Sequence, residues 1–268
     1  MSALAEHVRF ELRSMVRHPS QLLMSYLFPL GFFLFMGTVM PRVNPAATAT
    51  LVPAFGLFVI FTGAVLGLPT PLVDARRLGV ARSFRVIGVP DAAALGVPAV
   101  ANATHGLLAA SLVTLVGPLA FHAEAPVHPV AFFLVLILAA FVFTGLGSLI
   151  GVISADGRTS VLWSQSLFLP SMLLGGLMMP LSALPEGLRR FSAILPTSHL
   201  VRLHDAFAYG RAPTDGLWVE ALALFATGVI AYAAAGRLYA AEERVASPWR
   251  GLWVPAALAP LAATMLGS

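Results

Sequence analysis

Residues 129–153 read PVAFFLVLILAAFVFTGLGSLIGVI, a stretch without a single charged side chain. A helix needs about 20 mainly apolar residues to cross the hydrocarbon core of a bilayer. This stretch is long enough for one crossing, and it has no polar face that could lie in water. We therefore expect residues 129–153 to form a transmembrane helix, and this expectation decides the class of fold.

The composition of the rest of the chain agrees with a membrane location. Of the 268 residues, 58% are hydrophobic and only 10% are charged, whereas a soluble domain carries about 25% charged residues. The hydrophobic residues are also spread over the whole length. A chain with so few charges cannot cover a water-facing surface, so we expect one all-α membrane domain over residues 1–268.

Apolar stretches on both sides of residues 129–153 bring the expected number of spans to six. These spans are residues 22–40, 51–73, a run within 92–121, 129–153, 161–184 and 217–236. The third run is longer than one span needs, so we place its membrane part at 100–121 and residues 91–98 in the interface. The apolar tail 251–268 contains Pro255 and Pro260 and is not counted as a span.

The distribution of arginine predicts the orientation, because cytoplasmic loops carry an excess of positive charge. All 16 basic residues are Arg. One side of the six-span topology receives 11 of them and the other side 5, so we expect both termini in the cytoplasm and the chain in the inner membrane of a bacterium. Within residues 1–19, Leu4, Val8 and Leu12 recur at helical spacing, as in an amphipathic helix on the membrane surface.

Several kinds of chemistry are absent from the sequence. Without lysine the chain has no standard P-loop, whose Lys reaches the nucleotide phosphates, and without cysteine it has no thiolate metal site. Motifs of metalloproteases, of serine hydrolases and of Mg²⁺-dependent prenyl enzymes are also missing. His199 and His204 are five residues apart and point to diverging faces of a helix. We therefore expect no catalytic, cofactor or metal site, and the small net charge of +4 predicts no nucleic-acid partner.

The loop after the second expected span, residues 74–90, is the longest on the Arg-rich side. It reads DARRLGVARSFRVIGVP and has helical periodicity, with Leu78 and Arg82 near one face and Val80 and Phe84 near another. A short amphipathic helix of this kind can bind anionic lipid headgroups. It can equally press into a groove of a partner protein and transmit force, and the residues alone leave both roles open.

Two regions of the chain resemble the ABC-2 type permeases, the membrane subunits of type V ATP-binding-cassette exporters. In the loop at 74–90 the matching residues are Asp74, Arg76, Arg77, Gly79, Phe84 and Pro90, with Asp74 in place of the usual Glu and Val80 in place of the usual Thr. After the fifth expected span the matching residues are Gly175, Gly176, Pro180, Leu184, Pro185, Leu195 and Pro196. The two regions lie in the expected order, and the resemblance covers nearly the whole chain.

The resemblance implies a fold and a function. The fold has six transmembrane helices, an interfacial N-terminal helix and external re-entrant helices over residues 185–211. ATP and Mg²⁺ bind to a separate ATPase, which docks at a coupling helix over 74–90, and a second permease copy or a related permease completes the path. The implied coupling residues are Asp74, Arg76, Arg77, Gly79, Arg82 and Phe84.

The substrate class stays open at this point. An amphipathic drug, antibiotic or lipid would suit a path lined by aromatic and Met side chains, whereas a polysaccharide or ion exporter would share most of the motifs. A polytopic membrane enzyme or sensor is the alternative from another class. The candidate path residues are Phe55, Phe58, Asn102, His105, Ser164, Gln165, Phe168 and Met172. For each of them, ordinary packing between helices is the competing interpretation.

Overall fold

The computed structural model describes residues 23–43, 45–86, 88–212, 215–240 and 251–264. The surface helix expected over 1–19 lies outside these residues. All the regular elements that are described are helices, as the composition predicted. In chain order they are η1 (Leu23–Leu27), α3 (Phe28–Val43), α4 (Pro45–Thr62), η2 (Gly63–Gly67), α5 (Pro69–Arg77), α6 (Val80–Val86), α7 (Asp91–Phe121), α8 (Pro129–Ile153), α9 (Gly157–Leu174), η3 (Leu181–Ala183), α10 (Glu186–Ser192), α11 (Pro196–Leu203), η4 (His204–Ala208), α12 (Leu217–Ala240) and α13 (Trp253–Thr264).

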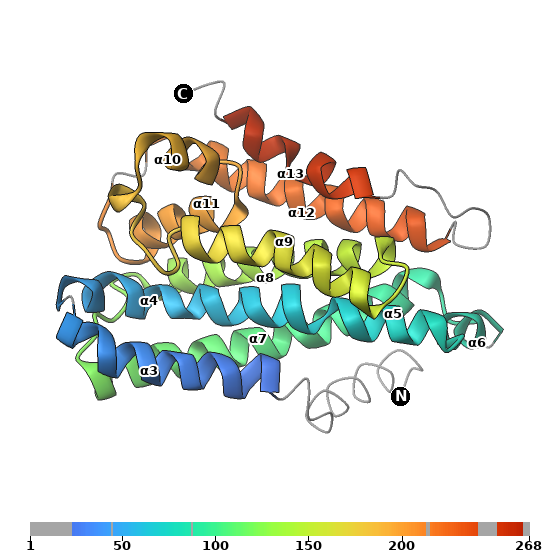
Figure 1. The fold of residues 1–268 in the computed structure, drawn as a ribbon, viewed down its shortest axis with the longest axis horizontal. Helices are drawn as coiled ribbons and strands as arrows, with labels where there is room; N and C mark the ends of the chain where they lie inside the picture. Colours follow the sequence, from blue (N-terminus) through green and yellow to red (C-terminus); the bar gives the residue numbers. More distant parts are fainter. Residues whose placement is uncertain (1–22, 44, 87, 213–214, 241–250, 265–268) are drawn as a thin grey trace.

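The long helices run side by side along the longest axis of the molecule, and the short helices α6, α10 and α11 lie towards its two ends (Figure 1). The turn between α5 and α6 lies at one end, together with the link from α8 to α9; we call this the corner end. Helices α10 and α11 lie at the other, the hairpin end. Four helical segments are long and apolar enough to cross a membrane: Ala54–Arg77, Asp91–Phe121, Pro129–Ile153 and Leu217–Ala240. The chain is thus a multi-pass membrane protein.

Two expected spans differ in extent from the helices observed. Helix α7 is continuous over 31 residues, with Pro98 inside it, and at 1.5 Å per residue it is about 46 Å long. Its first turns thus continue the axis of the span beyond the hydrocarbon, and do not form a separate surface segment. Helix α9 ends at Leu174, ten residues before the expected end at 184, because Gly176 turns the chain with φ of +87°.

Helix α8, whose sequence suggested the fold, lies at its centre and contacts α4, α5, α7, α9 and α12. Every residue from Val142 to Ser154 is buried. Gly147 and Gly151 are four residues apart on one face, where Gly151 lies against Leu72 and the backbone of Pro69 in α5. Small residues allow two backbones to approach closely, as is common between membrane helices. Close packing on α8 therefore positions α4 and α5.

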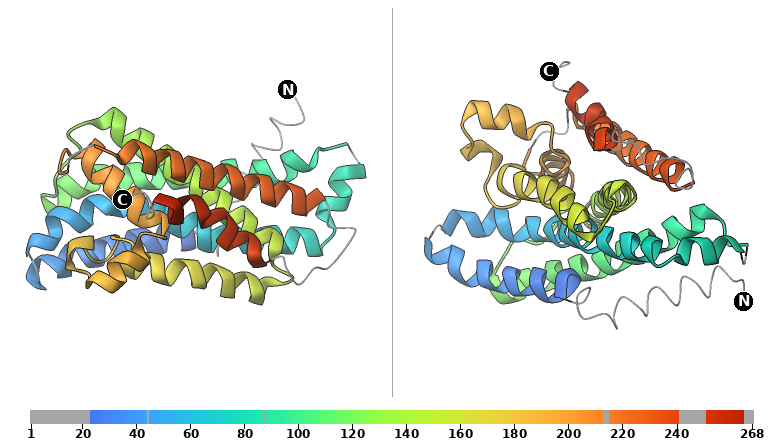
Figure 2. Two further views of the ribbon diagram at one scale, coloured as in Figure 1. Left: turned by 90° about the horizontal axis from the view of Figure 1, so that it is seen from above. Right: turned by 45° about the vertical axis from the view of Figure 1, so that its right-hand side comes forward.

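The apolar tail, whose role the sequence left open, forms a packed helix. Helix α13 runs back alongside α12 in the opposite direction (Figures 1 and 2). It buries Val254, Ala257 and Leu261, which share one helix face. Its last residue, Thr264, borders a cavity at the hairpin end together with Glu220. The expected position of the C-terminus on the Arg-rich side concerns residues beyond Thr264, which lie outside the described residues.

Candidate functional site

The loop expected to form one helix over 74–90 is divided into two parts in the structure. Helix α5, which continues the span from α4, ends at Arg77, and the seven-residue α6 begins at Val80. Gly79 has φ of +74° at the break, a conformation that glycine adopts without steric cost. The chain therefore turns at Leu78 and Gly79, and only α6 with its flanking turns projects from the end of the span.

This break changes the expected role of Asp74. A coupling helix over 74–90 would place Asp74 in its first turn, where the positive end of the helix dipole stabilises an anion. Asp74 instead lies in the last turn of α5, and its backbone carbonyl accepts a hydrogen bond from the amide of Leu78 at 2.9 Å. The dipole at this end disfavours a carboxylate, so that part of the expectation is wrong.

Arg76 ties the corner to the central helix. Its Nη1 atom donates hydrogen bonds to the backbone oxygens of Gly151 at 2.7 Å and of Ser154 at 3.3 Å. These oxygens lie at the C-terminal end of α8, where backbone carbonyls lack partners within the helix and a cation is favourable. Arg76 thus bonds within its own chain, whereas the resemblance had implied that it contacts a partner.

The link between α8 and α9 completes the corner end. Asp156 caps the first turn of α9 by accepting a hydrogen bond from the backbone amide of Thr159 at 2.7 Å. This bond lowers the pKa of the Asp156 carboxyl, and the nearby positive charge of Arg77 lowers it further. Arg77 itself is exposed. The corner end therefore presents basic groups to solvent beside a well-capped helix start.

The apolar side chains of the corner do not point as we expected. Phe84, which the resemblance implied as a coupling residue, is partly buried and packs against the core of its own chain. Leu78 and Val86 are each 81% exposed. The break at Gly79 separates α5 from α6, so the periodicity of one continuous helix does not predict which side chains of the corner are exposed. The side chains of Arg82 and Arg85 are not described.

The aromatic residues of the expected path lie in the interior of this chain. Phe58 and Phe168 have ring centroids 6.3 Å apart, and Phe168 stacks on Phe61 at 5.2 Å. Phe55 is 5.5 Å from Phe58 and also contacts Phe33 in α3. All of these side chains are buried. Their arrangement is that of a packed aromatic core joining α3, α4 and α9.

The polar path candidates in α7 bond to neighbouring helices. The side-chain amide of Asn102 donates to the backbone oxygen of Gly63 at 3.0 Å, at the first residue of the π-helix η2. The Nδ1 atom of His105 shares a hydrogen bond with the hydroxyl of Tyr26 in η1. A buried amide in a membrane helix needs such a partner, because hydrocarbon offers none. Both residues thus act as links between helices in this structure.

The remaining path candidates lie on α9. Ser164 is buried, while Gln165 and Met172 are half-buried, and Met172 packs against the core. None of the eight path candidates borders either of the two cavities described below. Within a single copy of the chain, the described cavities therefore lie elsewhere.

At the hairpin end, two prolines begin the short helices that follow α9. Pro185 precedes the first residue of α10, and Pro196 is the first residue of α11. Gly175 at the end of α9 lies so close to Thr197 that a side chain there would overlap with it. The segment expected to be re-entrant thus consists of short helices fastened to the end of α9.

The charges of the hairpin end are largely paired, and Glu220 and Asp205 are the main acceptors. Arg202 Nε donates to both oxygens of Glu220 at 3.0 and 3.2 Å. Arg211 bonds Glu124 Oε2 at 2.6 Å and Asp205 Oδ1 at 3.2 Å. Among the described residues, no group of three or more His, Cys, Asp or Glu side chains could hold a metal ion. Arg190, Arg202 and Arg211 thus each have an acidic partner within the chain.

Comparison with known proteins assigns the class. Residues 4–204 match the model of the ABC-2 type transporter family, and the chain belongs to this family. The match ends within η4, so α12 and α13 lie beyond it. A relative in Bacillus subtilis (strain 168), named "Putative transport permease YvfS", is 24% identical over 230 residues, which cover 84% of this chain and 92% of the relative.

Proposed function

We propose that this chain is the membrane subunit of an ATP-driven exporter in the inner membrane of a bacterium, with the corner end in the cytoplasm. In this proposal a separate ATP-binding-cassette ATPase binds ATP and Mg²⁺ and docks at the corner. Membership of the ABC-2 type family supports a transport permease. The observation that carries the coupling role is the bond from Arg76 to the end of α8.

The geometry of the corner supports transmission of force from such a partner. Helix α5 is continuous with the span from α4 through η2, so a displacement of the corner moves that span directly. Arg76 joins the same point to α8, which contacts most of the other long helices. A push on α6 would therefore reach two central helices together. Leu78 and Val86 are suited to anchor the partner, since both expose apolar side chains.

The proposal places the substrate path between two copies of the chain. The aromatic path candidates pack inside one copy, and exposed apolar side chains cover several outer helix faces. On α7 these are Leu108, Leu112, Leu115 and Leu119. Such faces meet either lipid or another copy. An amphipathic substrate, such as a drug, an antibiotic or a lipid-like molecule, would suit an apolar path of this kind.

Purification of the tagged chain from the membranes of its native host tests the ATPase partnership. We expect Mg²⁺-dependent ATP hydrolysis to co-elute with the unaltered chain. The double variant Leu78→Asp, Val86→Asp should reduce the co-eluting activity at least tenfold, because interface anchors contribute about 2 kcal/mol or more.

The matched control is Leu188→Asp, which places the same charge on an exposed leucine at the hairpin end. This variant should retain the ATPase. Equal loss in the control and in the double variant would contradict docking at the corner, and no hydrolysis with the unaltered chain would contradict the partnership itself.

A further inference from the structure

A large cavity lies at the hairpin end, between the α10–α11 connection, α12 and α13. Its volume is about 910 Å³, within the range of about 300–1,000 Å³ that is typical of small-molecule sites. The cavity exists because α13 folds back along α12. Neither of these two helices lies in the part of the chain that matches the family model.

One wall of this cavity is apolar and built from small side chains. Helix α12 contributes a single face, with Val219, Leu222, Ala223 and Ala226 at spacings of three and four residues. Helix α13 contributes Pro260 and two neighbours opposite that face. The alanines leave the space open, and the exposed side chains of Val219 and Leu222 show that it opens on the outer, lipid-facing side of α12. An alkyl chain would fit along this wall.

The second wall is charged, and most of its charges satisfy one another. His199 is buried, with its Nε2 atom 2.7 Å from the oxygen of Ala193 and its Nδ1 atom 2.9 Å from Glu220 Oε2. Arg202 bonds the same carboxylate and also lies 2.9 Å from His199 Nδ1. These three side chains form a closed network that holds α11 against α12.

Two further charges at the same cavity have opposite signs and no such partner. Arg189 and Asp215 both line it, and neither side chain has an ion pair or hydrogen bond to another described residue. The adjacent Arg190 differs, since it pairs with Glu186 at 2.6 Å and does not line this cavity. Among the described residues, the mouth of the cavity thus offers one cation and one anion without an ion pair.

The position of the cavity matches the headgroup level of a bilayer. It lies at the first turn of α12, where Trp218 is 68% exposed, and tryptophan is enriched at the membrane–water interface. The charged mouth is at this level, while the apolar wall extends along α12 towards the middle of the span. A molecule with a charged head and one alkyl chain would have each part in a suitable environment.

We propose that this cavity binds a zwitterionic membrane lipid with a single alkyl chain, of the phosphoethanolamine type. The phosphate lies on the guanidinium of Arg189, the ammonium on the carboxylate of Asp215, and the alkyl chain between α12 and α13. This inference goes beyond the proposed transport function and does not depend on an ATPase partner. Charge-assisted hydrogen bonds of this kind are stronger than those between neutral groups.

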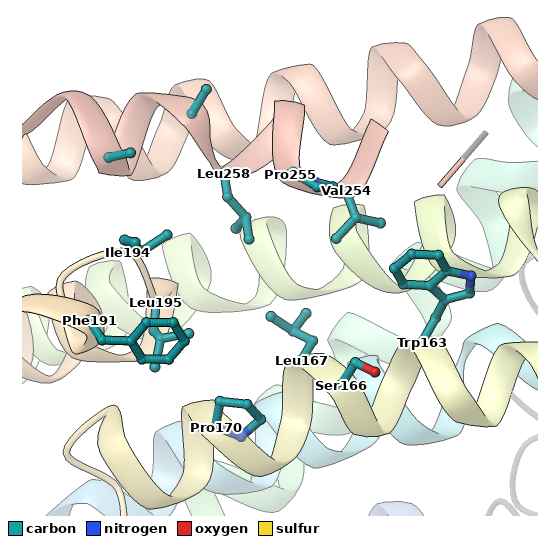
Figure 3. A pocket seen from close by; sticks show the side chains of 12 residues that line it. Trp163, Ser166, Leu167, Pro170, Phe191, Ile194, Leu195, Val254, Pro255 and Leu258 are labelled. Atoms are coloured by element: carbon teal, nitrogen blue, oxygen red, sulfur yellow. The ribbon is translucent and has the colours of Figure 1, made fainter. Parts of the chain in front are cut away.

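A second hollow beneath α13 shows what distinguishes the proposed site. Figure 3 shows an apolar cavity of about 290 Å³ between α9 and α13, bordered by Trp163, Leu167 and Phe191. No charged side chain lines it, so it offers nothing that would select a headgroup. Of these two hollows, the larger combines an apolar wall with two charged side chains that have no ion pair among the described residues, and it therefore indicates a ligand class.

Binding to the purified full chain in an uncharged detergent tests the proposal with three probes. The first is lysophosphatidylethanolamine. The second, lysophosphatidylglycerol, lacks the ammonium group, and the third, lysophosphatidylcholine, has an ammonium group without an N–H donor. Titration calorimetry should give the tightest binding for lysophosphatidylethanolamine. Arg189→Ala should weaken that binding about tenfold, whereas Arg190→Ala should leave it unchanged. Asp215→Asn should weaken the binding of lysophosphatidylethanolamine but leave the binding of lysophosphatidylglycerol unchanged.

Filling the cavity gives an independent test. Ala263→Phe should reduce binding of lysophosphatidylethanolamine, and Ala256→Phe should not, because Ala256 is exposed on α13 and lines neither hollow. Thermal unfolding of each variant controls for folding. The proposal is overturned if the three lysolipids bind equally, if Arg189→Ala and Arg190→Ala have the same effect, or if inorganic phosphate alone displaces the lipid.

Discussion

Arg76 shows how a single side chain connects the corner to the rest of the molecule. The guanidinium reaches two backbone oxygens at the end of α8, where helix carbonyls lack intrahelical partners. The neighbouring Arg77 carries the same charge but is exposed. Two adjacent arginines therefore have different roles, one in holding helices together and the other on the surface.

Replacement of Arg76 should cost stability that replacement of Arg77 does not. Arg76→Ala leaves the oxygens of Gly151 and Ser154 without this donor, so we expect the free energy of unfolding to fall by about 1–3 kcal/mol. Thermal unfolding of the purified chain measures the difference, with Arg77→Ala as the matched control. Equal melting temperatures for the two variants would show that the bond to α8 contributes nothing.

For single residues, the sequence showed which polar side chains need a bonding partner more reliably than it showed where a side chain points. Asn102 and His105 stood out as polar groups in a span, and both make a bond to another helix. The contacts of the Arg76 and Phe84 side chains could not be predicted. Those of Arg76 depend on how closely α8 approaches, and those of Phe84 on the break at Gly79. The periodicity of one segment shows neither the approach nor the break.

Among the elements, α8 and its glycine face determine how closely the helices pack. A methyl group on Gly147 would overlap with the backbone oxygen of Ala64 in η2. That oxygen belongs to the backbone, so it can move only if the whole of η2 moves. The face formed by Gly147 and Gly151 is therefore a place where the sequence of one helix limits the position of another.

Gly147→Ala should destabilise the chain although alanine is the better helix former. Overpacking of this kind costs about 1–3 kcal/mol, and we expect a lower melting temperature in detergent. Gly96→Ala in α7 is the control, because no atom lies within 4 Å of the added methyl group. That variant should be neutral or gain about 0.5–1 kcal/mol. A higher melting temperature for both variants would contradict the close contact between Gly147 and the backbone of Ala64.

The length of a helix was predictable where polar residues flank an apolar run. It was not predictable where an apolar or helical pattern continues past a turn of the chain. The bounds of α8 agree with the expected span at 129–153, since flanking polar residues and Pro129 mark it clearly. The end of α9 was placed too late, because residues beyond Gly175 are apolar but turn away from the helix. The sequence permits a bend at Gly79, but the helical periodicity of residues 74–90 does not show that the helix ends there, with φ of +74°.

In the arrangement of the whole molecule, the packing of α13 along α12 is the feature that the sequence predicted least. Helix α13 is short, contains Pro260, and by length alone is too short to span a membrane. Its place beside α12 comes from tertiary packing of Val254, Ala257 and Leu261. The cavity with Arg189 and Asp215 follows from that placement, and no motif in the sequence indicated it.

The orientation of the molecule can be measured because the chain contains no cysteine. Ser83 at the corner end and Ala125 at the opposite end are both exposed. With the corner in the cytoplasm, a membrane-impermeant maleimide should label Ala125→Cys in intact spheroplasts and Ser83→Cys only in inverted vesicles. The reverse pattern would contradict the excess of arginine as the determinant of orientation.

Cross-linking in native membranes tests most directly whether the corner receives the ATPase. A short thiol–amine cross-linker should join Ser83→Cys to the ATPase chain, and it should give no such product with Ala125→Cys, which serves as the control at the hairpin end. Mass spectrometry of the product identifies both chains. The proposed function predicts the ATPase product from Ser83→Cys alone; an ATPase product from Ala125→Cys, or none from Ser83→Cys while the ATPase still co-purifies, would contradict it.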